Sequence, residues 1–174
     1  MLEDDILILR RPELKDKKQL MELKKEFLDR NEVIYGGGSL EKFEKYEEWL
    51  EKCKNSETNP PEGRVPGTQL ITVRKLDNKI VGVINLRHYL NDFLLQHGGH
   101  IGYSVLPSER GKGYSTIQCA LALKYLKKLG VNRVLITCDK NNPASARTII
   151  RNGGVLENEF DEDGVIVQRY WINN

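Results

Sequence analysis

A glycine-containing turn between an apolar segment and an amphipathic one constrains the fold of this chain more than any other feature. Residues 101–106 form a mostly apolar run that Pro107 stops, and residues 116–129 carry apolar side chains at helical spacing. The turn between them contains Gly111 and Gly113. Gly130 closes the helix, and residues 133–138 form a second apolar run. This order predicts the strand–helix–strand unit of an α/β fold.

Further periodic segments surround this unit. They predict strands at residues 6–9, 69–74, 79–87, 155–156 and 165–171, and helices at 14–28, 40–53 and 144–151. Residues 76–78 supply a turn, so the strands on either side of it are expected to form a hairpin. The element order predicts an α/β fold with a mixed, mostly antiparallel central sheet and helices on both faces. The strands at 101–106 and 133–138 are the pair expected to be parallel.

Length and composition favour one soluble domain spanning residues 1–174. Of the 174 residues, 39% are hydrophobic and 30% are charged, with a formal net charge of +2. That charge is too balanced to indicate nucleic acid as the main partner. No segment approaches the roughly 20 apolar residues that cross a bilayer, so no membrane partner is expected.

The three cysteines add a second constraint. The chain has an odd number of cysteines, Cys53, Cys119 and Cys138, and none of them forms a CxxC pair. This pattern indicates neither a disulfide framework nor a metal site. The acidic N-terminal residues do not resemble a secretory signal. Reduced thiols and the lack of a signal together predict a cytoplasmic protein.

The turn before the helix at 116–129 has the properties of a phosphate-binding loop. A helix N-terminus presents unpaired N–H groups, and glycines let the backbone approach an anion closely. Arg110 and Lys112 would add positive charge. The GxxxxGK[ST] nucleotide loop is absent, and GxGxxG is only half present because Thr116 occupies the third glycine position. A plain strand-to-helix turn remains an equal alternative for this segment alone.

The context of this turn resembles the GNAT superfamily of acetyl-CoA-dependent N-acetyltransferases. The family motif R/Q-x-x-G-x-G/A is matched by Arg110, Gly113 and Ser115, with Ser replacing the final Gly or Ala. The preceding strand ends in Val105-Leu106-Pro107, as in the family pattern.

A second family feature lies downstream. Asn142 and Ser145 have the Asn-x-x-Ser spacing, and a short segment then ends at Gly153. Residues 100–103 (HIGY) look like the branch that contains ribosomal-protein and antibiotic acetyltransferases. The resemblance covers roughly residues 69–171 and implies a splayed parallel strand pair in a GNAT-like sheet.

The resemblance also implies an acetyl-CoA site. The backbone of Val105 and Leu106 would contact the acetyl carbonyl and the pantetheine arm, and amides of residues 110–115 would hold the pyrophosphate. Asn142 and Ser145 would contact the pantetheine, or would only cap the following helix. The residues expected to bind acetyl-CoA are therefore Val105, Leu106, Arg110, Gly111, Lys112, Gly113, Tyr114, Ser115, Asn142 and Ser145.

The implied activity is transfer of the acetyl group to a primary amine of a small molecule or peptide, by direct attack in a ternary complex without a metal. Many relatives are dimers, so a homodimer is one expected arrangement. The position of the family's usual tyrosine acid holds Ile149, which cannot donate a proton. That departure supports an alternative, a non-catalytic CoA-binding or regulatory module of the same fold.

Candidate groups for proton transfer are few. His100 is the expected catalytic base, because it stands where relatives often carry Glu and titrates near neutral pH; the alternative is a structural histidine. Ser145, Tyr103, a water molecule or no specific acid would protonate the thiolate. The acceptor site is expected between the two N-terminal helices, residues 36–38, residues 55–67 and the final hairpin.

Overall fold

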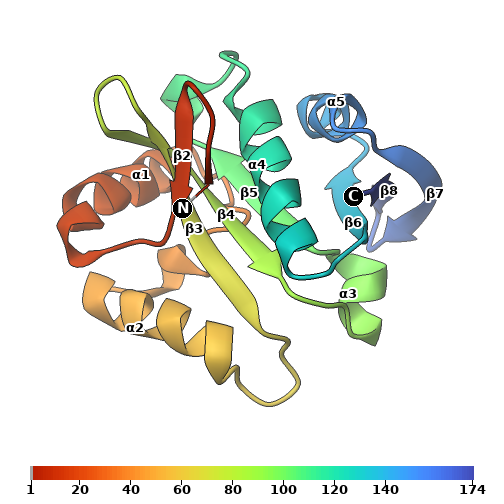
Figure 1. Ribbon diagram of the computed structural model, residues 1–174, viewed down its shortest axis with the longest axis horizontal. Coiled ribbons are helices and arrows are strands. Elements are labelled where there is room, and N and C mark those ends of the chain that lie inside the picture. Colours follow the sequence, from red (N-terminus) through yellow and green to blue (C-terminus); the bar gives the residue numbers. More distant parts are fainter. Residues whose placement is uncertain (1) are drawn as a thin grey trace.

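Two antiparallel sheets form the framework of the protein in the computed structural model, which describes residues 2–174 (Figure 1). The larger sheet has the order β1-β2-β3-β4-β5, and the smaller has the order β6-β8-β7. The strands of the larger sheet are β1 Leu2–Glu3, β2 Leu7–Arg10, β3 Gly67–Arg74, β4 Lys79–Arg87 and β5 Ile101–Val105. Those of the smaller sheet are β6 Arg133–Asp139, β7 Val155–Glu162 and β8 Val165–Asn173.

Helices cover both faces of the larger sheet. The α-helices are α1 Lys17–Asp29, α2 Tyr46–Thr58, α3 Asp92–His97, α4 Tyr114–Lys128 and α5 Pro143–Arg151. Short 3-10 helices occur at Leu14–Asp16, Leu40–Lys42 and Pro107–Glu109. In Figure 1, α1 and α2 lie on one side of the sheet and α4 lies on the other.

The alternation of side chains along β3 explains this layering. Leu70 belongs to the core cluster that contains Leu121 of α4, whereas its neighbour Ile71 belongs to the cluster that contains Leu23 and Trp49 of α1 and α2. Successive strand residues point to opposite faces, so a strand buried on both sides reads as a continuous apolar run. The predicted mixed α/β fold with helices on both faces is confirmed.

Strands β5 and β6 diverge into separate sheets. They approach one another near Gly99, which forms an isolated antiparallel bridge with Ile136. The N–H of Leu135 donates to the side-chain Nδ1 of His100 rather than to a strand carbonyl. The expected splay is therefore present: every ladder described for residues 2–174 is antiparallel, and none joins β5 to β6.

The elements otherwise follow the sequence, with these differences. Strand β1 was not predicted, and the helix expected at 40–53 is displaced, because Leu40–Lys42 forms a 3-10 helix and α2 runs from Tyr46 to Thr58. Helix α3 was not predicted, because a helix of six residues shows no clear period; Asn91 caps it by accepting the N–H of Leu94. Strand β7 runs well beyond residues 155–156, because its polar residues pair with β8 at an exposed sheet edge.

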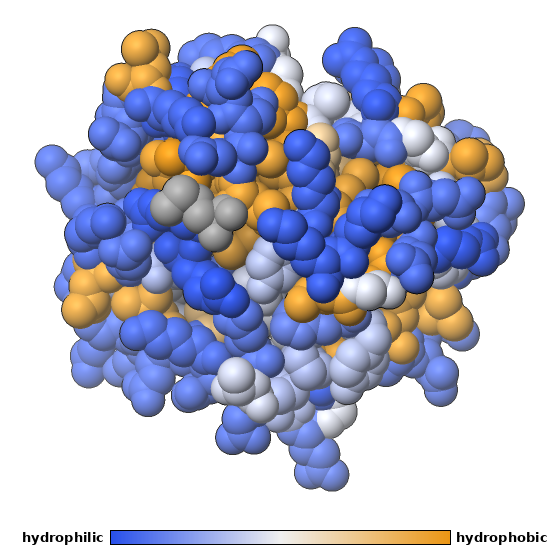
Figure 2. Space-filling view, in the orientation of Figure 1, coloured by the Kyte–Doolittle hydropathy of each residue, from blue (hydrophilic) through white to orange (hydrophobic). Residues whose placement is uncertain are grey.

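The surface is dominated by hydrophilic side chains, with separate apolar areas between them on the face shown in Figure 2. No helix within residues 2–174 is both long enough and apolar enough to span a membrane. Cys53, Cys119 and Cys138 are all free and buried.

Candidate functional site

The turn between β5 and α4 presents a row of free main-chain donors. In residues 2–174, no hydrogen bond is made by the backbone N–H groups of residues 111–115, and Gly113 caps α4 without a side-chain partner. Gly111 and Gly113 both have φ of +80°, and a Cβ at either position would meet no atom within 4 Å. This open helix N-terminus can bind an anion through its backbone.

The charged side chains of the turn are already engaged. Arg110 donates to Glu32 and, through Nε, to the carbonyl of Val105 at 3.3 Å. Lys112 Nζ lies 2.6 Å from Oε2 of Glu109. The expected contribution of Arg110 and Lys112 as free cations facing a phosphate is therefore not observed, and the free donors belong to the main chain.

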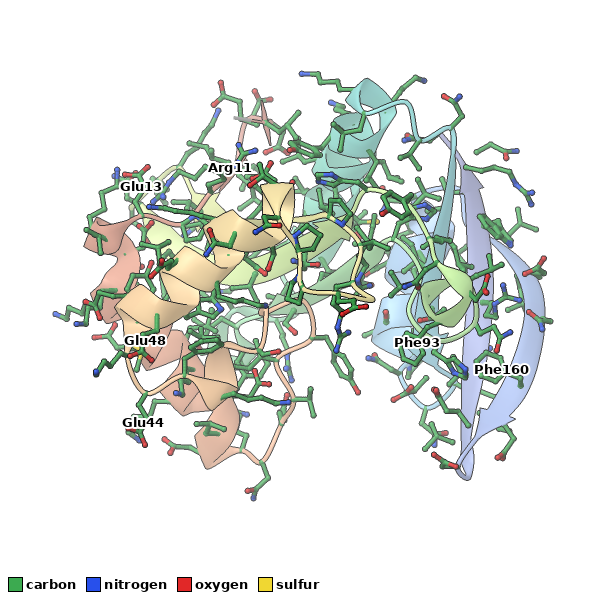
Figure 3. The ribbon with its side chains drawn as sticks, turned by 90° about the horizontal axis from the view of Figure 1, so that it is seen from below. Arg11, Glu13, Glu44, Glu48, Phe93 and Phe160 are labelled. Atoms are coloured by element: carbon green, nitrogen blue, oxygen red, sulfur yellow. The ribbon has the colours of Figure 1, made fainter. Side chains whose placement is uncertain are left out.

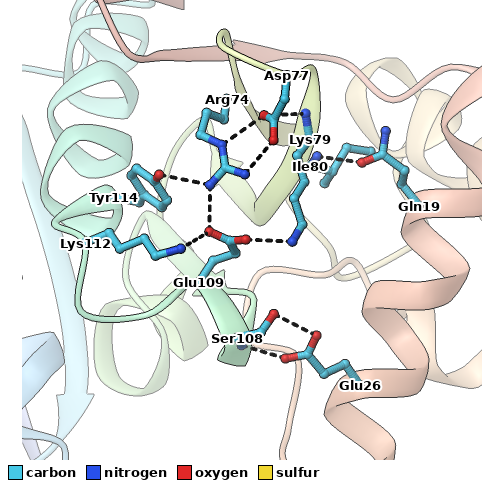
Figure 4. Close-up of polar contacts among 10 residues, drawn as sticks. All are labelled: Gln19, Glu26, Arg74, Asp77, Lys79, Ile80, Ser108, Glu109, Lys112 and Tyr114. Carbon is cyan, nitrogen blue, oxygen red and sulfur yellow. Dashed lines mark hydrogen bonds and ion pairs between the residues drawn. The ribbon is translucent and has the colours of Figure 1, made fainter.

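Glu109 fixes the turn on the hairpin of β3 and β4 (Figure 4). Its carboxylate is buried and accepts from Arg74, Lys79 and Lys112 at 2.6–2.7 Å. These cations, with Lys112 and Lys79 first, lower the pKa of Glu109 to about 2. Sequence reasoning missed this residue, because nothing in the spacing connects it to a hairpin thirty or more residues away.

The end of β5 offers one of the two predicted backbone donors. The N–H of Leu106 donates to the carbonyl of Val81 at 2.8 Å, so it is already used within the sheet. Successive N–H groups of a strand point to opposite edges, so the N–H of Val105 points away from β4, toward the opening between β5 and β6.

Side-chain contacts bring α4 and α5 to this opening. Ser145 Oγ lies 2.8 Å from the hydroxyl of Tyr103 on β5, and Ser115 Oγ lies 2.8 Å from the hydroxyl of Thr148. Asn142 caps α5, since its Oδ1 accepts the N–H of Ser145 at 3.1 Å. The structure thus places the predicted residues of β5, the turn and α5 around one opening, with Asn142 in the capping role.

His100 sits at the point where β5 and β6 separate. It is 5% exposed, and its Nδ1 accepts the N–H of Leu135 at 3.0 Å. Burial, together with the charge of Arg87, lowers the pKa of His100 to about 4. These contacts favour a structural role, because the lone pair that a base needs is already occupied.

A cavity of about 870 Å³ lies on the face of the sheet covered by α2. It is lined by residues 33–39, by α2, by residues 60–67, by β3 and β4 and by α3. The predicted acceptor elements, residues 36–38 and 55–67, therefore contribute to one cavity. Tyr46 and Trp49 of α2, whose spacing is that of a core stripe, are fully buried in the core and do not line the cavity.

The final hairpin adjoins α3 at the edge of this cavity. Figure 3 shows Phe93 of α3 near Phe160 of β7. The ring of His97 lies between them, 5.1 Å from Phe93 and 5.9 Å from Phe160, and its Nδ1 is 2.6 Å from Glu162. Glu162, at the end of β7, therefore helps to hold α3 in place.

Comparison with known families gives one match. The profile described as Acetyltransferase (GNAT) domain matches residues 7–155. No curated protein sequence matches the chain.

Solved structures show the same fold at low sequence identity. A GNAT-family acetyltransferase from Bacillus anthracis is 20% identical, with a TM-score of 0.67 and coverage of 99% of this chain and 97% of the other. The microcin C7 self-immunity acetyltransferase MccE, solved with acetyl-CoA and AMP, is 21% identical (TM-score 0.72; 98% and 94% covered). The spermidine/spermine N-acetyltransferase SpeG from Vibrio cholerae, solved in mutant forms, is 19% identical (TM-score 0.67; 98% and 95% covered).

Proposed function

The chain belongs to the GNAT family of acetyltransferases, and from this premise we propose that it transfers the acetyl group of acetyl-CoA to a primary amine. One observation supports the cofactor most strongly: five consecutive backbone N–H groups at the N-terminus of α4 have no partner within residues 2–174. They form a site for the pyrophosphate that needs no side-chain cation. The 15-residue length of α4 adds a helix dipole of the right sign.

The residues around the β5–β6 opening support the chemical step. Acetyl-CoA, when bound, supplies an activated thioester; the amine nitrogen forms a C–N bond as the C–S bond breaks, in a ternary complex. The outward N–H of Val105 is positioned to polarise the acetyl carbonyl. Ser145 and Asn142 then border the pantetheine arm, in addition to the cap that they form.

Tyr103 is the proton donor that the geometry favours for the thiolate. A tyrosine hydroxyl is protonated at neutral pH, because its ordinary pKa is about 10. Burial raises the pKa of Tyr103 further, so the case for it as donor rests on its position and not on its acidity. That hydroxyl lies 2.8 Å from Ser145 Oγ, close to the N-terminus of α5. Ile149, in the place of the family's usual tyrosine, is fully buried. His100 as the catalytic base stays a prediction, in competition with its structural role.

A non-catalytic CoA-binding module is the second candidate, and Ile149 is the observation that favours it. The acceptor in the leading proposal is the amine of a small molecule or peptide. Named relatives of the same fold include a spermidine/spermine N-acetyltransferase. The cytoplasmic location and the homodimer expected from the sequence remain predictions.

An acetyl-transfer screen separates the two candidates. The protein is incubated with acetyl-CoA and a panel of polyamines, aminoglycosides, amino acids and peptide N-termini, while free CoA thiol and acetylated product are measured together. We expect equal amounts of thiol and acetylated amine with at least one acceptor. Binding of acetyl-CoA without thiol release from any acceptor would favour the non-catalytic module.

A further inference from the structure

Two arginines in the acceptor-side cavity lack an acidic partner. Arg87 of β4 and Arg64 of the 60–67 loop both line the cavity, and neither forms an ion pair with any carboxylate of residues 2–174. The half-buried Arg87 donates through Nη1 to the carbonyls of Gly98 and Gly99, each at 3.1 Å. Those acceptors are neutral, so they leave its charge uncompensated.

Other shielded arginines of this protein are neutralised. Arg10, Arg74 and Arg169, whose side chains are 15–19% exposed, each hold a carboxylate at 2.6–2.9 Å. In the cavity, burial and the nearby charge of Arg64 instead lower the pKa of Arg87. A shielded cation next to a second cation is unfavourable unless an anion joins them.

We propose that Arg87 and Arg64 bind an anionic group of the acceptor, so that the substrate is a small amine that also carries a carboxylate or a phosphate. This inference rests on the acetyltransferase function proposed above. Guanidinium groups suit both anions, because their planar N–H donors match the two oxygens of either group.

The guanidinium of Arg87 lies beside Gly102 of β5. A Cβ added to Gly102 would stand 3.4 Å from Arg87 Nη2 and 3.3 Å from the backbone N of Gly36, so Arg87 and the 36–38 loop both pack close to this strand. Gly102 and Val105 are three residues apart on β5, which corresponds to about 10 Å along a strand. An anion at Arg87 would therefore allow an amine several bonds away to reach the end of β5.

The other charged groups of the cavity also fit an acceptor with two charges. His97 is paired with Glu162, whereas Lys52 Nζ donates to the neutral carbonyl of Gly38 at 2.9 Å and so adds a third cation to the cavity lining. Glu41 lines the same cavity, and its buried Oε2 has no hydrogen-bond partner. An unpaired carboxylate in the same cavity as the unpaired arginines complements a molecule with both an ammonium and an acidic group.

Matched acceptor pairs test this proposal. Each pair contains an amine with and without its anion, namely an amino acid with its amide, and phosphoethanolamine with ethanolamine. We expect the anionic member of at least one pair to have a kcat/KM at least about tenfold higher, the discrimination of one charge-assisted contact. The pair that shows the difference distinguishes a carboxylate from a phosphate.

Variants then assign the preference to the arginines. Arg64→Gln should raise KM for the anionic member about tenfold and leave the neutral member unchanged. Arg64 is exposed on a loop, so this change leaves the fold intact. Arg87→Lys keeps the charge but loses the forked geometry, and should raise the same KM. Lys54→Gln removes the same charge from the exposed side of α2 and should change KM for neither the anionic nor the neutral acceptor.

A binding measurement covers the case in which no panel member is acetylated. With CoA saturating the α4 site, inorganic phosphate should raise the melting temperature of the wild type but not of Arg64→Gln, relative to chloride at equal ionic strength. Equal kcat/KM within every pair would overturn the proposal. So would an equal rise in melting temperature with phosphate for the wild type and Arg64→Gln. Neither result affects acetyl-CoA binding, whose absence would instead count against the proposed acetyltransferase function.

Discussion

The backbone N–H of Leu135 donates to the imidazole Nδ1 of His100 over 3.0 Å, and this contact joins β6 to the start of β5. His100 also donates its backbone N–H to the carbonyl of Leu135 at 2.7 Å. His100 therefore replaces part of a strand ladder exactly where the two sheets separate. The neutral ring is required, because a protonated Nδ1 cannot accept.

This contact makes stability depend on pH. The pKa of His100 is lowered to about 4 from its model-compound value of 6.5, so between these values the unfolded chain binds more protons than the native one. We expect the free energy of unfolding to fall as pH decreases from 6.5 to 4, by up to about 3 kcal/mol. Urea unfolding at several pH values measures this loss. His100→Asn should flatten the slope in that window, whereas an unchanged slope would exclude His100 as its source.

The catalytic and structural roles of His100 make opposite predictions for the same variant. Asparagine keeps an oxygen that can accept the Leu135 N–H but cannot act as a base near neutral pH. The structural role predicts that His100→Asn retains acetyl transfer and its pH profile. The base role predicts a fall of about 100-fold or more in kcat with acetyl-CoA binding preserved. Because the lone pair is occupied in the structure, we expect the first result.

Glu109 should couple protein stability to acetyl-CoA binding. Glu109→Gln removes the buried charge shared by Arg74, Lys79 and Lys112, and we expect a loss of about 1–3 kcal/mol in the free energy of unfolding. The turn would lose its anchor on the hairpin, so acetyl-CoA affinity should also fall. Denaturant unfolding and calorimetric titration measure the two effects.

Glu44→Gln is the matched control for this change. Glu44 is exposed and forms no side-chain hydrogen bond or ion pair within residues 2–174; Figure 3 shows it at the periphery of the molecule. Its replacement should alter neither quantity. Equal effects of the Glu44 and Glu109 variants would show that net charge, not the buried carboxylate, is responsible.

Tyr103→Phe tests the proton donor. The substitution removes the hydroxyl that contacts Ser145 but keeps the ring, so the fold and acetyl-CoA affinity should be preserved. We expect kcat to fall about 100-fold or more, since a positioned general acid contributes about 10²–10⁴-fold. Steady-state kinetics with the best acceptor of the screen measures it. An unchanged kcat would contradict this role for Tyr103 and would indicate that solvent protonates the thiolate.

Local patterns were sufficient to predict most elements but not the contacts between them. Burial on one or two faces produces the residue pattern of β3 and β4 and the helical period of α4. Both patterns can be recognised in the sequence. The glycine turn was also located correctly. The partners of Arg110 and Lys112 were not predicted. Glu32, the partner of Arg110, lies 78 residues away in the sequence. Glu109, the partner of Lys112, is buried and also binds Arg74 and Lys79 of a distant hairpin.

The acceptor cavity shows the same limit. Its contributing segments, residues 36–38 and 55–67, were predicted. The unpaired state of Arg87, Arg64 and Glu41 was not, because it depends on which groups the fold leaves without partners. The contact that joins the two sheets was not predicted for a related reason. The side chain of His100 occupies the place of a strand carbonyl, and no periodic pattern reveals this.

Calorimetric titration of acetyl-CoA into the wild type, Gly113→Glu and Gly113→Asn tests most directly whether the free N–H groups of α4 bind the cofactor. Asparagine tolerates the positive φ of this position, whereas glutamate places a carboxylate beside the same donors. We predict 1:1 binding by the wild type, retained binding by the Asn variant and none by the Glu variant. Absence of binding to the wild type at millimolar acetyl-CoA, or equal affinity for Gly113→Glu, would contradict the assignment.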